Sequence, residues 1–484
     1  MPECMRLICR IPPNNNKICL RNTALAAMIR RKNMKHPFRS AVAAVSSMVM
    51  LTSLAACGGS DTAQSDEKEL TISWYYSSGG GDTWERAIKL YKKENPDVKI
   101  NEVHTSFPQM QKNASLTLQA DDAPDVALYN QGTSSVGNLA SQGILADLSE
   151  YADKYGWTDT LPESIQTVAK YKADDGGVMS SDGEWYGVPV NGEFVLAYYN
   201  QDMFDKNGIA IPETFDELES AMQQFVDKGI TPVAFEGNET ASQHLWYQLV
   251  LSKANRQFVD DYQSYEHDVD FSSEPFTYAA NKFSEWVQKG YLPSNSGGLV
   301  AEDMITQFCA GEYPIMFSGS WWFGRVNQDG NFKSTFRALP GNEKLNTGAT
   351  GKLWVVPETS KHKDLAADFL NFLLSKDVQN MLATEAGLPF NASDDYSIDS
   401  LPDELKNPLK TFDDMQDSAK EFNTVFEQLL DNDAIALYPD WPSVGMYDAL
   451  NSALQGLING NSTPEQATGE IKAAYEEGKS DLGL

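Results

Sequence analysis

The sequence has little cysteine, and most of it lies near the N-terminus. Four of the five cysteines, Cys4, Cys9, Cys19 and Cys57, fall within the first 57 residues, and Cys309 follows alone. If the segment before Cys57 is removed and Cys57 itself is modified, Cys309 has no partner for an internal disulfide. Cys309 is expected to be a small buried hydrophobe rather than a nucleophile.

Basic residues are also scarce, with 38 Lys and Arg against 68 Asp and Glu. Nine of the basic residues but only one acidic residue precede Cys57, so the chain from Cys57 onward has a net charge of −38. Such a surface repels phosphate backbones, which argues against nucleic acid as a partner. We interpret the acidic excess as a solvated exterior rather than as a site for a substrate.

No run of apolar residues is long enough to cross a membrane. The uncharged stretch 41–56 has sixteen residues and includes serine and threonine, whereas a membrane-spanning helix needs roughly 20 apolar residues. Five basic residues lie just upstream, between Arg30 and Arg39. The order of basic, apolar and small residues is that of a secretory signal peptide. Residues 1–33 do not fit its basic start, so Met28 or Met34 is the expected initiator.

Leu54, Ala55, Ala56 and Cys57 resemble the lipobox of bacterial lipoproteins, whose cysteine is acylated and becomes the mature first residue. The resemblance implies that residues 1–56 are a leader and signal peptide and that Cys57 is a lipid anchor. Two or more acyl chains hold a protein stably on a membrane. Residues 57–68 would then be a flexible polar linker that tethers a soluble domain to the extracellular face of the cell membrane.

The apolar pattern of residues 69–129 alternates between strand and helix. It predicts strands at 69–76, 97–103 and 125–129, with helices at 82–94 and 107–120 between them. This order argues for an α/β fold with a mainly parallel sheet covered by helices on both faces. The length after Cys57 exceeds one ordinary core and suggests two lobes.

Further along the chain, a helical region at about 148–171 and a turn-rich hairpin at 172–190 are predicted, followed by a strand at 194–200. Thr214 and Glu217 have the spacing of a capping box, which predicts a helix that begins there. Two more helices are expected over 241–254 and 275–289.

The apolar strand in "EYPIMFSGSWW" ends at Gly319, which places Trp321 and Trp322 just beyond its carboxyl end. Ligands bind outside the carboxyl ends of strands in open α/β sheets. The two indoles are therefore a candidate site, although tryptophan is largely buried on average and could fill a core instead.

Two long stretches carry a family pattern. The first is "YGVPVNGEFVLAYYNQDMFDKNGI", followed by "PETFDELESAM". In it an apolar strand ends in Tyr-Asn, and a helix then begins at Pro-Glu-Thr and an aromatic residue. The second is "GKLWVVPETSKHKDLAADFLNFLLSKDVQNMLATEAGLPFN", in which a helix ends near a Gly-Leu-Pro turn. Their order resembles the solute-binding proteins of ATP-driven sugar importers, the maltose-binding-protein-like family, over nearly all of 69–484. The chain departs from the family pattern at two places. The residues before the Tyr-Asn pair are Leu196, Ala197 and Tyr198, and Phe390 with Asn391 stand where relatives carry Arg.

The resemblance implies a two-lobed periplasmic-binding-protein-like fold, with a hinge and a ligand cleft between the lobes that closes on a sugar. The first lobe is expected at 69–190 and 349–411, and the second at 191–348 and 412–484. The implied function is an extracellular, lipid-anchored binding protein that captures a sugar, expected to be an oligosaccharide, and delivers it to an ABC permease. A monomer that is not an enzyme, with no cofactor or metal, is implied.

A sugar needs flat aromatic platforms for its ring faces and polar groups for its hydroxyls. The resemblance places a stacking tryptophan at Trp321, next to Trp322, and a hydroxyl-binding carboxylate at Glu193. Other positions come from strand ends, the Gly-Leu-Pro turn and a late aromatic region, although Tyr129 and Tyr447 could be core-edge residues and Glu236 a loop charge. The full predicted set is Tyr76, Ser78, Tyr129, Asn130, Glu193, Glu236, Trp246, Trp321, Trp322, Asn391, Asp440, Trp441 and Tyr447.

Two other functions compete with transport. A secreted glycoside hydrolase would use two carboxylates about 5 to 10 Å apart, but carboxylates are too common here for any pair to be informative. No G-x-S-x-G or H-E-x-x-H motif occurs, and the histidines after Cys57 are isolated in the sequence: His104, His244, His267 and His362. A passive surface carbohydrate-binding protein would commonly show repeats or Ser/Thr-rich stalks, and the sequence shows neither.

Overall fold

The computed structural model describes residues 68–75, 81–265, 267–341, 344–350, 352–385, 387–406 and 412–484. The predicted signal peptide and the anchor Cys57 lie outside the described residues, as do the predicted site residues Tyr76 and Ser78. Among the residues described, none of the helices is both long enough and apolar enough to span a membrane.

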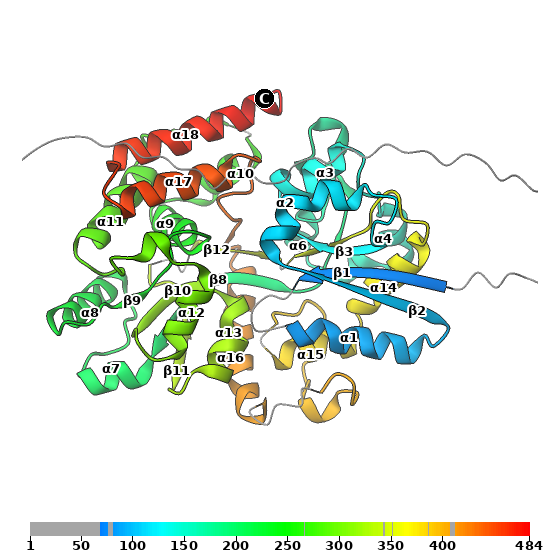
Figure 1. Cartoon of the computed structure of the whole chain (residues 1–484), viewed down its shortest axis with the longest axis horizontal. Coiled ribbons are helices and arrows are strands. Elements are labelled where there is room, and N and C mark those ends of the chain that lie inside the picture. The colour runs from blue at the N-terminus through cyan, green and yellow to red at the C-terminus, as the bar shows by residue number, and fades with distance from the viewer. Residues whose placement is uncertain are drawn as a thin grey trace, which may run out of the picture. The chain divides into compact units, whose positions relative to one another are not determined.

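The first lobe is the part of the chain that packs around a five-stranded sheet (Figure 1). Its elements, in chain order, are β1 (Lys68–Tyr75), α1 (Gly81–Glu94), β2 (Val98–Thr105), α2 (Phe107–Leu118), β3 (Val126–Tyr129), the π-helix η1 (Thr133–Gly137), α3 (Asn138–Ser141), α4 (Ser149–Tyr155), α5 (Trp157–Thr160), α6 (Glu163–Thr167), β4 (Lys170–Lys172), η2 (Ala173–Asp175), β5 (Val178–Met179), β6 (Glu184–Trp185), β7 (Val188–Pro189), β13 (Leu353–Val355), α14 (Lys363–Leu373), α15 (Lys376–Thr384) and η5 (Ile398–Ser400).

The sheet of the first lobe has the strand order β2-β1-β3-β13-β7. Strand β1 pairs in parallel with β2 and with β3, which confirms the order predicted from residues 69–129. Helix α1 covers the sheet because Trp84, Ile88 and Tyr91 recur at helical spacing and are all buried. The predicted hairpin is confirmed by antiparallel pairing of β4 with β5.

The predicted helical region at 148–171 is confirmed over most of its length as three short helices, α4, α5 and α6, but its last residues belong to β4. Gly156 adopts a left-handed conformation, with φ of 68°, and ends α4. Leu161, which precedes Pro162, is extended as a residue before proline prefers to be, so α5 ends there. Glycine and proline therefore divide the segment.

The second lobe packs around a six-stranded sheet. Its elements are β8 (Gly192–Asn200), α7 (Gln201–Asn207), α8 (Phe215–Asp227), β9 (Val233–Ala234), α9 (Ala241–Leu251), α10 (Arg256–Ser264), α11 (Glu274–Gln288), η3 (Ser296–Gly298), α12 (Ala301–Cys309), β10 (Ile315–Gly319), η4 (Ser320–Trp322), α13 (Phe323–Asp329), β11 (Ser334–Arg337), β12 (Asn346–Thr350), α16 (Phe412–Asp431), β14 (Ile435–Ala436), α17 (Met446–Ile458) and α18 (Pro464–Asp481).

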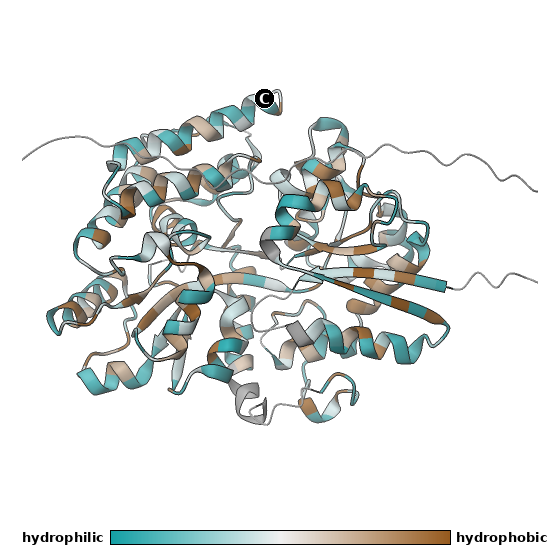
Figure 2. Ribbon diagram, viewed as in Figure 1, coloured by the Kyte–Doolittle hydropathy of each residue, from teal (hydrophilic) through white to brown (hydrophobic). Residues whose placement is uncertain are grey.

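Strand β8 organises this second sheet, since every one of its residues is buried and it pairs with β10, β11 and β12. Helix α9 packs against β10 and β12 of the sheet, α11 and α17 pack against α9 and against each other, and α18 packs against α11 and α17 (Figure 1). The capping box predicted at Thr214 and Glu217 is confirmed at the start of α8. Figure 2 shows the resulting pattern, with apolar residues on the inner strands and polar residues on the outer faces of the helices.

The chain crosses between the two sheets at two described positions. Strand β7 of the first sheet leads into β8 of the second, and β12 of the second leads back into β13 of the first. The crossings are adjacent, because Glu193 of β8 pairs with Ala349 of β12. Side chains near these crossings are therefore placed where residues of both lobes meet.

Candidate functional site

A small hydrophobic cluster, which we call the interlobe cluster, joins residues of both lobes. Its fully buried residues belong to neither lobe core, while Met179 also packs against the first core and Trp321 against the second. Val168 and Met179 come from the first lobe, Val195 and Ala349 from the strands at the crossings, and the aromatic members from the second lobe. The aromatic residues are Tyr438 and Trp441, with half-buried Trp321 packed against them.

Trp441 contacts the first lobe directly. Its carbonyl oxygen accepts a hydrogen bond of 3.2 Å from the backbone N–H of Ser134 in η1. A Cβ atom on Gly132 would lie 2.8 Å from Trp441 Cβ, and Gly132 has a φ of 94°. Both facts require glycine at that position, because other residues rarely adopt this φ and would collide with the indole.

Two aromatic rings of the second lobe flank His244, and a third contacts one of them. The centroid of its imidazole lies 5.7 Å from that of Trp321 and 5.2 Å from that of Tyr438. The Tyr438 ring lies 5.2 Å from that of Trp441. Trp321 follows β10 in the short helix η4, which confirms its predicted position beyond a strand end.

His244 and Tyr438 are functional candidates that the sequence reasoning missed. Both are buried, and neither His244 Nδ1 nor Tyr438 Oη has a hydrogen-bond partner among the described residues. Burial and the charge of Lys352 lower the pKa of His244 to about 3, so its imidazole is neutral. Leaving a buried polar group unpaired costs about 1 to 3 kcal/mol. Both groups would therefore gain from a ligand that offers hydrogen bonds.

An ion pair stands at the crossings beside these rings. Lys352 Nζ lies 3.3 Å from Glu193 Oε2, and both side chains are mostly buried. The same ammonium lies 5.9 Å from the centroid of the Trp321 ring. Glu193 belongs to the first crossing and Lys352 to the second, so the pair links the two segments that join the lobes.

Asp440 adds a second carboxylate to the site. Burial raises its pKa to about 6, although the charge of Lys352 acts in the opposite direction. Burial, followed by the charges of Glu193 and Asp440, raises the pKa of Tyr438 well above its ordinary value. Burial also raises the pKa of Tyr447 to about 12, and Asp440 adds to this shift. The charge of Asp440 therefore acts on both tyrosines.

The first lobe contributes tyrosines from the ends of two neighbouring strands. Tyr75 ends β1. Burial raises the pKa of Tyr75 well above its ordinary value, and interactions with Glu193 and Tyr129 add to this shift. Tyr129 ends β3, is buried, and has its pKa raised to about 12 by that burial. Asn130 follows it and is also buried. Tyr75 was not predicted as a site residue, because the strand was expected to end one residue later, at Tyr76.

Glu236 is buried, and its carboxylate is occupied by the backbone. It accepts hydrogen bonds from the N–H groups of Asn238, Glu239 and Ala241 at 2.9, 2.6 and 2.5 Å. Burial raises its pKa to about 7 against the effect of these donors. Glu236 therefore holds the loop that leads into α9, the helix that carries His244.

Three predicted residues lie elsewhere. Trp246 is 1% exposed and packs against Tyr247 and Phe276 in the core of the second lobe. Trp322 is 3% exposed and belongs to the same core. Asn391 donates a hydrogen bond from Nδ2 to the Leu374 carbonyl oxygen at 2.9 Å.

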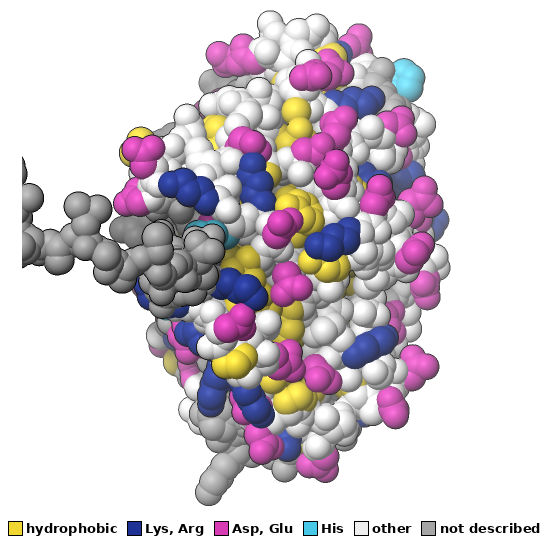
Figure 3. Space-filling view, turned by 90° about the vertical axis from the view of Figure 1, so that its right-hand side faces the viewer, with side chains coloured by type: hydrophobic (Ala, Val, Ile, Leu, Met, Phe, Trp, Pro, Cys, Tyr) yellow, Lys and Arg dark blue, Asp and Glu magenta, His cyan; other side chains and the backbone are white. Residues whose placement is uncertain are grey.

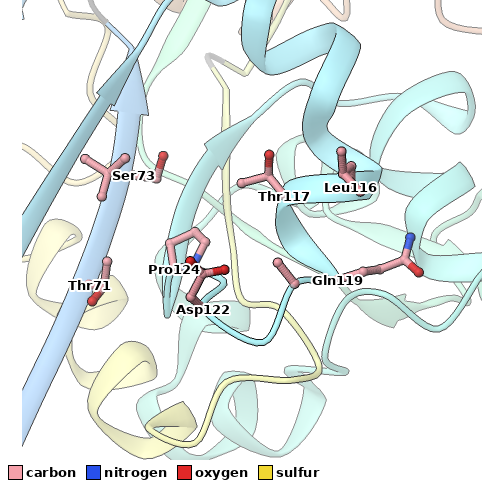
Figure 4. Close-up of a pocket in the computed structure, with 9 residues that line it drawn as sticks. Thr71, Ser73, Leu116, Thr117, Gln119, Asp122 and Pro124 are labelled. Carbon is pink, nitrogen blue, oxygen red and sulfur yellow. The ribbon is translucent and has the colours of Figure 1, made fainter. Parts of the chain in front are cut away.

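Among the described residues, neither a metal site nor a reactive cysteine adds to the interlobe cluster, and a pocket of the first lobe shares no residue with it. The described residues contain no group of three or more His, Cys, Asp or Glu side chains that could hold a metal ion. The buried position expected of Cys309 is confirmed. A pocket of about 530 Å³ lies in the first lobe, where Thr71 and Ser73 of β1 face Leu116 and Thr117 of α2 (Figure 4). It includes none of the predicted site residues.

Comparison with known sequences identifies a protein family that matches this chain. Residues 77–380 match the sequence model of the bacterial extracellular solute-binding proteins. A maltooligosaccharide ABC transporter solute-binding lipoprotein of Streptococcus pneumoniae is 26% identical over 388 residues, which is 75% of this chain and 83% of the relative. An arabinooligosaccharide-binding protein of Bacillus subtilis is 25% identical over 448 residues, which is 88% of this chain and 97% of the relative.

Solved structures share the fold. A substrate-binding protein of Listeria monocytogenes in complex with cycloalternan has a TM-score of 0.65 and 22% identity, covering 87% of this chain and 100% of its own. A maltose-bound protein of T. maritima has a TM-score of 0.65 and 17% identity, covering 84% and 99%. The predicted two-lobed α/β fold is therefore confirmed.

Proposed function

The chain belongs to the family of bacterial extracellular solute-binding proteins, and from this premise we propose that it captures a saccharide between its lobes and delivers it to the permease of an ABC importer. The similar proteins of Streptococcus pneumoniae and Bacillus subtilis are named for maltooligosaccharide transport and arabinooligosaccharide binding. An oligosaccharide is therefore the proposed ligand class.

The observation that carries this proposal is the composition of the interlobe cluster. The half-buried Trp321 ring lies beside His244 and Tyr438, whose buried polar atoms have no hydrogen-bond partner among the described residues. Sugars combine apolar ring faces with a rim of hydroxyls, so they match such a mixture. A purely apolar ligand would leave the polar atoms unpaired at a cost of about 1 to 3 kcal/mol each.

We assign roles from these surroundings. Trp321 and Trp441 are the proposed stacking platforms, and Glu193, Asp440 and Tyr447 are proposed to bind hydroxyls. Tyr129 and Asn130 are proposed contacts from the first lobe. Glu236 is a positioning residue in this scheme, since its carboxylate holds the loop before α9. Trp246, Trp322 and Asn391 are left out because they pack or hydrogen-bond away from the cluster.

The remaining parts of the proposal concern placement. We propose lobe boundaries at 69–190 with 349–411 and at 191–348 with 412–484, acylation at Cys57, attachment to the extracellular face of the cell membrane, and a monomer that catalyses no reaction.

On the face shown in Figure 3, acidic and basic side chains are interspersed, without a large patch of one sign.

Calorimetry with a panel of neutral oligosaccharides tests the function. Saturable one-to-one binding without product is expected, together with a smaller radius of gyration in solution scattering when the ligand is present, because hinge closure compacts two-lobed proteins. Product formation would favour a glycoside hydrolase. Binding without any change of shape would favour a passive carbohydrate-binding protein.

A further inference from the structure

The charges at the interlobe cluster are unequal in number. Lys352 is the cation whose charge acts on His244 and on Asp440 there. Two carboxylates are present with it: Glu193 pairs with Lys352, and Asp440 lies in the chain between Tyr438 and Trp441, two members of the cluster. His244 adds no positive charge, because burial lowers the pKa of its imidazole to about 3 and the ring is neutral at any higher pH.

Lys352 is also already engaged. Its ammonium lies 3.3 Å from Glu193 Oε2 and faces the Trp321 ring from 5.9 Å. Both members of the ion pair are largely shielded from water, with side-chain exposures of 21% and 12%. An incoming carboxylate would have to share this ammonium with Glu193. It would do so beside Asp440, and like charges in a shielded site repel strongly.

Hydroxyl groups meet no such obstacle. A sugar hydroxyl can donate to either carboxylate and can accept from Lys352 or from Tyr438. Hydrogen bonds to charged groups are stronger than those between neutral groups. The same residues that repel an anion therefore bind a neutral polyol.

We infer that this site takes an uncharged saccharide and discriminates against saccharides that carry a carboxylate, such as those containing a uronic acid. The inference rests on the proposed function and narrows its ligand class. Discrimination of this kind comes from a repulsive element as much as from an attractive one. Here that element is the carboxylate in excess over Lys352.

Matched ligand pairs test the inference. Xylotetraose is compared with xylotetraose that carries a glucuronic acid branch, and maltotriose with maltotriose oxidised to a carboxylate at C6 of one terminal unit. Affinities are measured by calorimetry at pH 7.5 in 0.5 M NaCl, because high salt screens the net negative charge of the whole protein. In any pair that binds, the neutral member is expected to bind at least tenfold more tightly.

Three variants separate the local charges from the global charge. Glu193→Gln releases Lys352 and should reduce or reverse the preference. Asp440→Asn removes the second carboxylate and should reduce the preference severalfold, even if Glu193→Gln binds nothing. Asp448→Asn, an exposed site on α17, removes one charge at the surface and should leave the ratio unchanged.

The outcomes are distinct. Equal or tighter binding of the carboxylate-bearing members by the unaltered protein overturns the inference while leaving the proposed function intact. The inference also fails if Asp440→Asn and Asp448→Asn change the ratio alike. If no member of either pair and no other saccharide binds, the proposed function fails and takes the inference with it.

Discussion

Two aromatic regions of the second lobe differ in their surroundings. The lobe core holds Trp246 and Trp322, which are 1% and 3% exposed and packed among apolar neighbours. The interlobe cluster holds Trp321 and Trp441 beside an ion pair and the half-buried carboxylate of Asp440, whose pKa is raised. Buried polar atoms without a partner among the described residues occur in both regions, at Trp246 Nε1 and Tyr247 Oη as well as at His244 Nδ1 and Tyr438 Oη. Residue type does not separate a core from a binding site, whereas the charged groups beside the rings do.

The adjacent residues Trp321 and Trp322 make this difference testable. Trp322→Ala should lower the free energy of unfolding by about 3 to 5 kcal/mol, because a large buried ring leaves a cavity. Saccharide affinity of the folded variant should stay within about threefold of the unaltered protein, a change worth less than 1 kcal/mol. Chemical denaturation and calorimetry check the two quantities. A loss of affinity without a loss of stability would place Trp322 in the site.

Asp440 should make stability depend on pH. Its folded pKa of about 6 lies above its ordinary value of 3.8, so between these values the folded state keeps a proton that the unfolded state releases. Stability should therefore fall as pH rises from about 4 to 6, by about 2 kcal/mol for this partly exposed residue.

Denaturation across that range, with Asp440→Asn as the comparison, measures the effect. The variant should lack this part of the slope and should gain stability relative to the unaltered protein as pH rises. Parallel curves for the two proteins would mean that Asp440 does not carry a raised pKa.

Trp321→Ala should have the opposite profile to Trp322→Ala. Saccharide binding should weaken well over tenfold, which is more than about 1.4 kcal/mol, because a stacking platform is lost. The free energy of unfolding without ligand should change little, since the ring is only half-buried. Equal losses of affinity and stability would return Trp321 to the core.

Tyr438→Phe should have the smallest effect. The hydroxyl has no hydrogen-bond partner among the described residues, so stability without ligand should change by less than about 1 kcal/mol and can rise. Affinity should fall about 2- to 10-fold, the worth of one hydrogen bond to the ligand. Unchanged affinity would remove Tyr438 from the proposed contacts.

The sequence predicted local elements better than long-range contacts. Strand alternation and the capping box at Thr214 depend on near neighbours, and both are confirmed in the structure. The helical character of segment 148–171 was also predicted, but its division at Gly156 and Pro162 and the strand β4 at its end were not.

At the site, the sequence indicated Trp321, Trp441 and Glu193 through the family resemblance, and the structure places all three at or beside the interlobe cluster. It did not indicate His244, Lys352 or Tyr438. His244 faces Trp321 only because α9 packs beside β10 and β12, and Lys352 meets Glu193 only because the two crossings are adjacent. Such contacts depend on tertiary structure and leave no periodic signal in the chain.

The central claim is that a saccharide binds at the interlobe cluster, and fluorine NMR of the protein labelled with 5-fluorotryptophan tests it most directly. Single Trp→Phe variants assign the ten tryptophan signals. Addition of a saccharide that binds should shift the signals of Trp321 and Trp441 and leave those of Trp246 and Trp322 nearly unchanged. Shifts confined to the two core tryptophans, with Trp321 and Trp441 unmoved, would contradict the account.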